Sequence, residues 1–114
     1  MTSRSVGRIR HRSTFVALRR PAGRVAVGPL RVSWVPPLPS DPFPQVSYAI
    51  GRRCGNAVER NRLRRRLRAV VGQAQLVPGS YLVIADPPAV NLGFSDLAST
   101  VGSAMSSAAA KGTR

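Results

Sequence analysis

The chain of 114 residues, 43% of them hydrophobic, is long enough for one compact domain with a modest core. Its 18 Lys and Arg residues against 4 Asp and Glu give a formal net charge of +14. This excess predicts a polyanionic partner, and nucleic acid is the first candidate. No stretch approaches the roughly 20 apolar residues of a spanning helix, so we expect no membrane partner. The N-terminal residues lack the apolar segment of a signal peptide, and we expect a cytoplasmic location.

The residues that could carry out chemistry are few and scattered. A single cysteine, Cys54, allows no internal disulfide, and the single histidine, His11, leaves no cluster of metal ligands. The acids offer no pair suited to acid–base work or to binding two metals: Asp41, Glu59, Asp86 and Asp96. We therefore predict no catalytic residue in this chain. Cys54 is expected to be buried as a small hydrophobe, and His11 to contact nucleic acid or solvent rather than to act as a base.

The N-terminal half of the sequence predicts an arm, a helix and a strand. Residues 1–12 alternate arginine with small residues, which is typical of a flexible basic arm. Ser13 or Thr14 could cap a short helix that ends near Arg20, with Phe15 and Leu18 toward the core. Residues 25–34 alternate apolar and polar side chains, as in a strand, with a break at positions 28–29. Five prolines within residues 36–44 predict a loop.

The remaining elements complete a single domain over residues 13–110. Residues 46–50 predict a strand with one bulky and one small face, and residues 81–85 predict a central strand that is apolar on both faces. A last helix begins near Ser95, and its apolar side chains recur at helical spacing. Residues 111–114 are expected to form a frayed tail.

Residues 51–71 hold eight of the chain's seventeen arginines. Asn56 and Glu59 have the spacing of a capping box, which predicts a helix from there to about Gln75. At 100° a residue, one side of this helix is apolar and consists of Leu63, Leu67, Val70, Val71 and Ala74. The opposite side is polar and consists of Asn61, Arg62, Arg65 and Arg68, with Arg66 at the flank and Arg60 and Arg64 beside the apolar stripe.

The arginines of this helix do not stabilise it by themselves. Arg60, Arg64 and Arg68 are neighbours at i,i+4 without an acidic partner, and each like-charge pair costs a few tenths of a kcal/mol in an isolated helix. A polyanion explains them better, because each neutralised phosphate releases counterions and guanidinium groups match phosphate oxygens. A merely solvated basic face is the weaker alternative, since solubility alone would mix Lys with Glu.

The segment RRCGNAVERNRLRRRLR, at positions 52–68, resembles the signature of the bacterial ribonuclease P protein family. That signature reads basic-basic-x-Gly-Asn-Ala-Val-x-Arg-Asn-Arg-x-basic-Arg-x-x-Arg, and the order of the other expected elements also agrees. The resemblance implies an α+β fold, a two-layer sandwich in which helices cover one face of a small mixed sheet. It also implies a left-handed β-α-β crossover at the motif helix, whereas general connection rules predict a right-handed one.

The resemblance further implies a function and a division of labour. The protein would be the accessory subunit of ribonuclease P, an endoribonuclease that removes the 5′ leader from precursor tRNA. The RNA subunit would carry out magnesium-dependent hydrolysis and hold the magnesium, and the protein alone would be inactive. Its implied partners are ribonuclease P RNA, in a 1:1 complex, and precursor tRNA.

The resemblance also implies roles for individual residues. Those expected to bind RNA are Arg52, Arg53, Arg60, Asn61, Arg62, Arg64, Arg65 and Arg68. Those expected in the cleft for the leader are Phe15, Arg19, Ala49 and Arg52, although Phe15 could equally be a core residue. Arg19 stands where many members have a second aromatic, so stacking in the cleft is expected to be reduced.

Two other classes of protein remain as alternatives. A ribosomal or ribosome-assembly protein could bind RNA through a similar helix, and reconstitution of precursor cleavage would discriminate between the two. A basic-region DNA-binding protein would need a dimerising heptad run after the arginines. The residues at 73–79 end the helix too soon for that.

Overall fold

The computed structural model describes residues 6–40 and 42–113. Their strands are β1 (Gly23–Val27), β2 (Leu30–Val35), β3 (Pro44–Ile50) and β4 (Gly79–Ala85). Their α-helices are α1 (Arg12–Ala17), α2 (Ala57–Gln73) and α3 (Phe94–Gly112), and two short 3-10 helices are η1 (Arg52–Cys54) and η2 (Pro87–Asn91). The predicted break at positions 28–29 is therefore the turn of the β1–β2 hairpin, where Gly28 has a φ of 56°.

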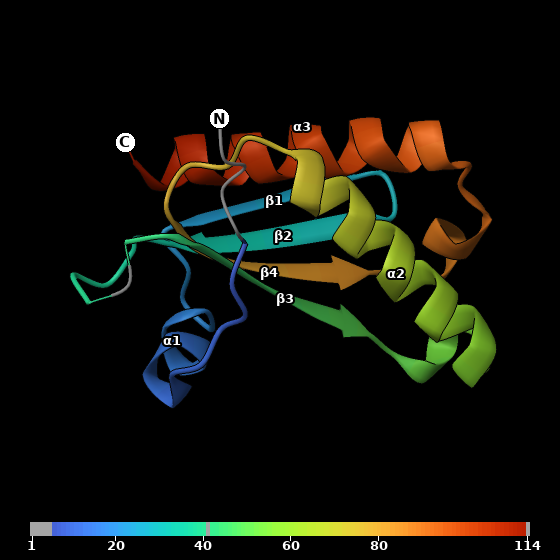
Figure 1. Cartoon of the computed structure of the whole chain (residues 1–114), viewed down its shortest axis with the longest axis horizontal. Coiled ribbons are helices and arrows are strands. Elements are labelled where there is room, and N and C mark those ends of the chain that lie inside the picture. The colour runs from blue at the N-terminus through green and yellow to red at the C-terminus, as the bar shows by residue number, and fades with distance from the viewer. Residues whose placement is uncertain (1–5, 41, 114) are drawn as a thin grey trace.

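The strands form one mixed sheet in the order β1-β2-β4-β3. β4 is central, as predicted, and pairs antiparallel with β2 and parallel with β3. The parallel pair is joined through α2, which lies against the sheet in Figure 1. Seen from the α2 side with β3 and β4 pointing upward, the chain moves leftward from β3 to β4, so this crossover is left-handed. β3 is thus an edge strand beside α2.

The two long helices, α2 and α3, cover one face of the sheet and enclose the main core. α2 contributes the buried side chains Leu63, Leu67, Val70 and Val71, which belong to the side that the sequence predicted to be apolar. α3 contributes Leu97, Val101, Met105 and Ala108, again at the predicted positions. The short helix α1 packs on the opposite face, where Leu18 joins a small cluster with Ile9, Val35 and Leu82.

The start of α2 is fixed by local chemistry that the sequence predicted. The Asn56 side chain accepts a hydrogen bond from the Glu59 backbone N–H at 2.9 Å, and the Asn56 backbone N–H donates to Glu59 Oε1 at 3.1 Å. Gly55, directly before the cap, has a φ of 124°, which favours glycine. Glu59 is therefore a cap residue. Cys54 is buried, as predicted, and its thiol lies 3.3 Å from the Ala85 carbonyl oxygen.

The predicted flexible arm is wrong for the part of it that the structure describes. The Gly7 N–H donates to the Pro44 carbonyl at 3.0 Å, and the Val46 N–H donates to the Gly7 carbonyl at 2.9 Å. Ile9 is 5% exposed, so this segment belongs to the folded body. Pairing at a sheet edge uses backbone groups and leaves no side-chain period in the sequence. Residues 1–5 of the predicted arm lie outside the described residues.

Three predicted boundaries also need correction. α1 begins at Arg12 and ends at Ala17, and residues 18–20 continue it only as a turn, because the Arg19 and Arg20 N–H groups bond three residues back. α2 ends at Gln73 rather than at Gln75. α3 extends to Gly112, so the first two residues of the predicted tail 111–114 belong to the helix. Arg114 lies outside the described residues.

Candidate nucleic-acid interface

The outer side of α2 carries the polar residues that helical spacing predicted there. Asn61, Arg62, Arg65 and Arg68 are exposed, and we call these four the cationic face. Arg64, partly buried beside them, donates from Nη1 to Asn61 Oδ1 at 2.9 Å. Arg64, Arg65 and Arg68 also line a hollow of about 470 Å³ on this surface, together with Val58 and Asn61. The surface is therefore cationic and concave.

Two further arginines of α2 lie outside the cationic face. Arg66, predicted at the flank, donates from Nη1 to the Leu92 carbonyl at 3.1 Å and ties α2 to the segment after η2. Arg60 was predicted to bind RNA, but its side chain is partly buried. Within residues 6–40 and 42–113, the Arg60 Nε is a buried donor without a hydrogen-bond partner. The stem of Arg60 is thus covered, as predicted for a residue beside the apolar stripe, and its contact with RNA stays a prediction.

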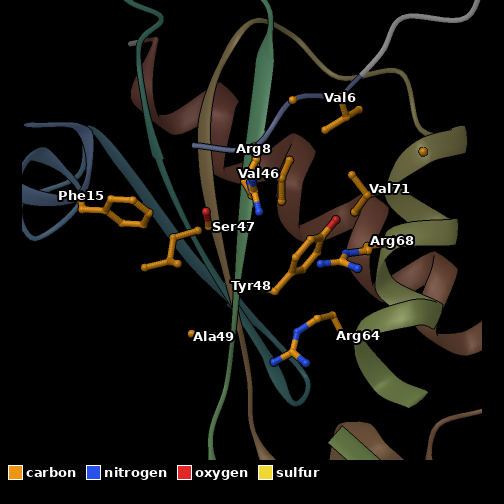
Figure 2. A pocket seen from close by; sticks show the side chains of 13 residues that line it. Val6, Arg8, Phe15, Val46, Ser47, Tyr48, Ala49, Arg64, Arg68 and Val71 are labelled. Carbon is orange, nitrogen blue, oxygen red and sulfur yellow. The ribbon is translucent and has the colours of Figure 1, made fainter. Parts of the chain in front are cut away.

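A groove of about 770 Å³ runs over β3, and we call it the β3 groove (Figure 2). Five segments line it: the chain before α1, α1 itself, β3, β4 and the inner edge of α2. Its lining consists of Val6, Gly7, Arg8, Phe15, Val46, Ser47, Tyr48, Ala49, Arg64, Arg68, Val71, Gly72 and Leu82. Arg64 and Arg68 line both this groove and the hollow on the outer side of α2.

The alternation of side chains along β3 gives the groove two unlike halves. Ser47 and Ala49 point toward the side of Phe15, whereas Tyr48 points toward α2 and its arginines (Figure 2). Phe15 is 42% exposed, so it is not the core residue that the sequence allowed as an alternative. One half therefore offers an aromatic ring and small side chains, and the other offers a phenol and two guanidinium groups.

The Tyr48 phenol lies in the cationic half of the groove. Burial raises the pKa of Tyr48, and the positive charge of Arg68 acts in the opposite direction. Because burial is the larger effect, the phenol stays protonated at neutral pH and can donate a hydrogen bond. The Arg68 guanidinium lies beside the Tyr48 ring, and Arg64 lies on the same side of the strand (Figure 2).

The residues predicted for the leader cleft do not all meet in this groove. Phe15 and Ala49 line it together, as expected. Arg19 does not, because it follows α1 and lines a different hollow, over Val35 and Pro36. Arg52 is exposed in η1, beyond the carboxyl end of β3, and does not line the groove either. Arg52 and Arg53 are instead exposed in η1, between the end of β3 and the start of α2.

Sequence reasoning missed Arg8 and Tyr48 as groove residues. Arg8 reaches the groove because the chain before α1 pairs with β3 at Gly7 and Gln45. No pattern in the sequence indicates that pairing. Tyr48 could have been found: it is a polar-tipped aromatic on an expected strand whose other face is small, directly before the arginine motif.

The described residues do not form a metal site of their own. Over residues 6–40 and 42–113, no three His, Cys, Asp or Glu side chains lie together in a way that could hold a metal ion. Asp86 accepts a bidentate interaction from Arg31, at 2.9 and 3.3 Å, and Glu59 is used in the cap of α2. Among the helices of the described part, none is long and apolar enough to cross a membrane.

Comparisons with known proteins agree with this geometry. Residues 4–109 match the sequence model of the family described as Ribonuclease P. The Ribonuclease P protein component of Acidothermus cellulolyticus is 38% identical over 95 residues, which cover 80% of this chain and 78% of that protein. The RNase P protein of Staphylococcus aureus superposes with a TM-score of 0.72 at 22% identity, covering 90% of this chain and 94% of that structure. For the Thermotoga maritima RNase P protein the TM-score is 0.71 at 17% identity, covering 86% and 94%.

The fold and the concave cationic surface are those of a small α+β protein suited to binding nucleic acid. The extent of the family match and the identity to the Acidothermus protein then show the family: this chain belongs to the ribonuclease P proteins. The family binds RNA and acts in the processing of precursor tRNA. The chain is accordingly a component of an endoribonuclease complex, with ribonuclease P RNA as its partner.

Proposed function

We propose that this chain is the non-catalytic protein subunit of that complex and that it holds the 5′ leader of precursor tRNA in the β3 groove. The cationic face of α2 binds the ribonuclease P RNA. The observation that carries the proposal is the position of Arg64 and Arg68, which line both the groove and the outer hollow. A single strand in the groove therefore lies directly beside RNA bound to α2.

The chemistry of hydrolysis is assigned to the RNA subunit. Two of the chain's four acids are already engaged: Glu59 caps α2, and Asp86 pairs with Arg31. We place the magnesium mainly on the RNA, and the absence of a cluster of metal ligands among the described residues supports this placement. This chain's own residues contribute positioning, because cations and an aromatic ring beside the leader align the scissile phosphate without transferring protons. The complex contains one protein and one RNA, because the protein has one cationic face to bind the RNA. We place it in the cytoplasm.

The test is reconstitution of precursor cleavage with a bacterial ribonuclease P RNA at low magnesium. The chain should restore cleavage that the RNA alone does not show under these conditions, and the protein without RNA should cleave nothing. Arg65→Ala/Arg68→Ala should lose this effect at a protein concentration where Arg24→Ala keeps it, because Arg24 lies on β1 at the other edge of the sheet. Cleavage by the protein alone would contradict the division of labour. No stimulation of the RNA would contradict the whole proposal.

A further inference from the structure

The Tyr48 side chain lines the β3 groove, but no function is yet assigned to its hydroxyl group. Among the described residues, no protein group hydrogen bonds to the Tyr48 phenol, although the other tyrosine, Tyr81, donates to the Val77 carbonyl at 2.8 Å. A phenylalanine would pack equally well beneath α2, so packing does not explain the hydroxyl. A half-buried donor beside a guanidinium group is instead suited to an anionic acceptor.

Because the edge of β3 is open, a single-stranded RNA can reach this donor from the other half of the groove. β3 is an edge strand, and the segment before α1 covers its edge only at the Gly7–Gln45 bridge. From Ser47 onward, no other described strand pairs with this edge. The lining of the groove continues across it, from Phe15 and Ala49 on one side to Tyr48 and Arg68 on the other. Bases can therefore lie at Phe15 while the backbone turns toward α2.

We propose that the Tyr48 hydroxyl, Arg64 and Arg68 form one phosphate-binding site for single-stranded RNA that crosses the edge of β3. The two guanidinium groups supply charge, and the phenol supplies a neutral donor of fixed direction. This inference rests on the proposed function, because it names the subsite that takes a phosphodiester of the strand in the groove. It also gives Arg64 and Arg68 a role beyond contact with the RNA subunit.

The experiment measures binding of a fluorescein-labelled five-nucleotide single-stranded RNA to the full chain over a series of salt concentrations. Tyr48→Phe keeps the ring and should weaken binding about tenfold, because a hydrogen bond to a charged acceptor is lost. The plot of log K against log salt should stay parallel to that of the wild type, since no charge is removed. Arg68→Ala should flatten the slope by about 0.7, the single-strand value for one phosphate. Thr100→Val removes a hydroxyl on α3 and serves as the matched control.

Equal affinity of wild type and Tyr48→Phe, both folded by circular dichroism, would overturn the phosphate site and leave the proposed function standing. A flattened slope in Tyr48→Phe would also overturn it, because the hydroxyl would then act only by placing Arg68. Failure of the wild type to distinguish leader-bearing precursor from leaderless tRNA, measured in complex with the RNA subunit, would instead contradict the groove's proposed function. A parallel loss in Tyr48→Phe alone supports the site.

Discussion

Arg64 and Asn61 lie one turn apart on α2, and the Arg64 Nη1 donates to Asn61 Oδ1 at 2.9 Å. This hydrogen bond holds a guanidinium group at the boundary between the outer hollow and the β3 groove. A fixed arginine loses less conformational entropy when it binds phosphate than a mobile one does. Asn61 is thus expected to act partly through Arg64 as a positioning residue.

Asn61→Ala should weaken binding to the ribonuclease P RNA by about two- to tenfold, because the Arg64 guanidinium loses the hydrogen bond that holds it in place. The salt dependence of binding should stay the same, because the substitution removes no charge. Filter binding at several salt concentrations measures both quantities. Gln75→Ala, at an exposed amide beyond the end of α2, is the matched control and should bind as the wild type does. A changed salt slope in Asn61→Ala would contradict the positioning role.

The cationic face makes binding to the RNA subunit strongly dependent on salt. If about six phosphates are neutralised, log K should fall with log salt at a slope of roughly −4 to −5. Arg65→Ala and Arg68→Ala should each flatten this slope by somewhat under one unit, whereas Arg24→Ala on β1 should leave it unchanged. A slope near zero for the wild type would exclude α2 as the main contact with RNA.

Leu67 tests the apolar side of the same helix. Its side chain is fully buried between α2 and the sheet. Leu67→Ala should therefore lower the free energy of unfolding by about 2–5 kcal/mol, as loss of a buried leucine does. Urea denaturation followed by circular dichroism measures the change. Val58→Ala, on an exposed position of α2, should change stability by no more than about 0.5 kcal/mol. Similar losses in both variants would show that the two sides of α2 are not distinguished by packing.

The sequence predicted the elements that depend on local patterns. The capping pair of Asn56 and Glu59, the two sides of α2 and the apolar spacing of α3 all follow from helical periodicity and are confirmed. The central position of β4 follows from its apolar side chains on both faces. These features depend on residues close together in the chain, so one sequence is enough to find them.

Features made by contacts between distant segments were harder to predict. The pairing of Gly7 with Gln45 uses backbone groups alone, and it brings Arg8 into a groove where a flexible arm was expected. Arg19, expected beside Phe15, lies beyond the end of α1 and lines another hollow, because α1 is shorter than expected. The place of α1 on the face opposite α2 and α3 depends on the Ile9 and Leu18 cluster, which has no period in the sequence.

Arg52 and Arg53 should affect binding more than chemistry. Both are exposed in η1, directly after β3, where their charges can contact RNA but no proton donor is required. In single-turnover cleavage by the reconstituted complex, Arg52→Ala/Arg53→Ala should raise the magnesium concentration needed and approach the wild-type rate when magnesium saturates. His11→Ala is expected to retain cleavage at high magnesium. Complete loss in His11→Ala that magnesium cannot restore would show that this chain supplies a catalytic group.

The most direct test of the account is the affinity of the reconstituted complex for precursor tRNA relative to mature tRNA. The wild-type complex should bind the leader-bearing precursor more tightly. Phe15→Ala removes a ring of the groove that is 42% exposed, and it should reduce this preference by about five- to 150-fold, the value of one stacked base. Its affinity for mature tRNA should stay unchanged. Equal binding of precursor and mature tRNA by the wild-type complex, or an equal loss for both in Phe15→Ala, would contradict the assignment of the β3 groove to the leader.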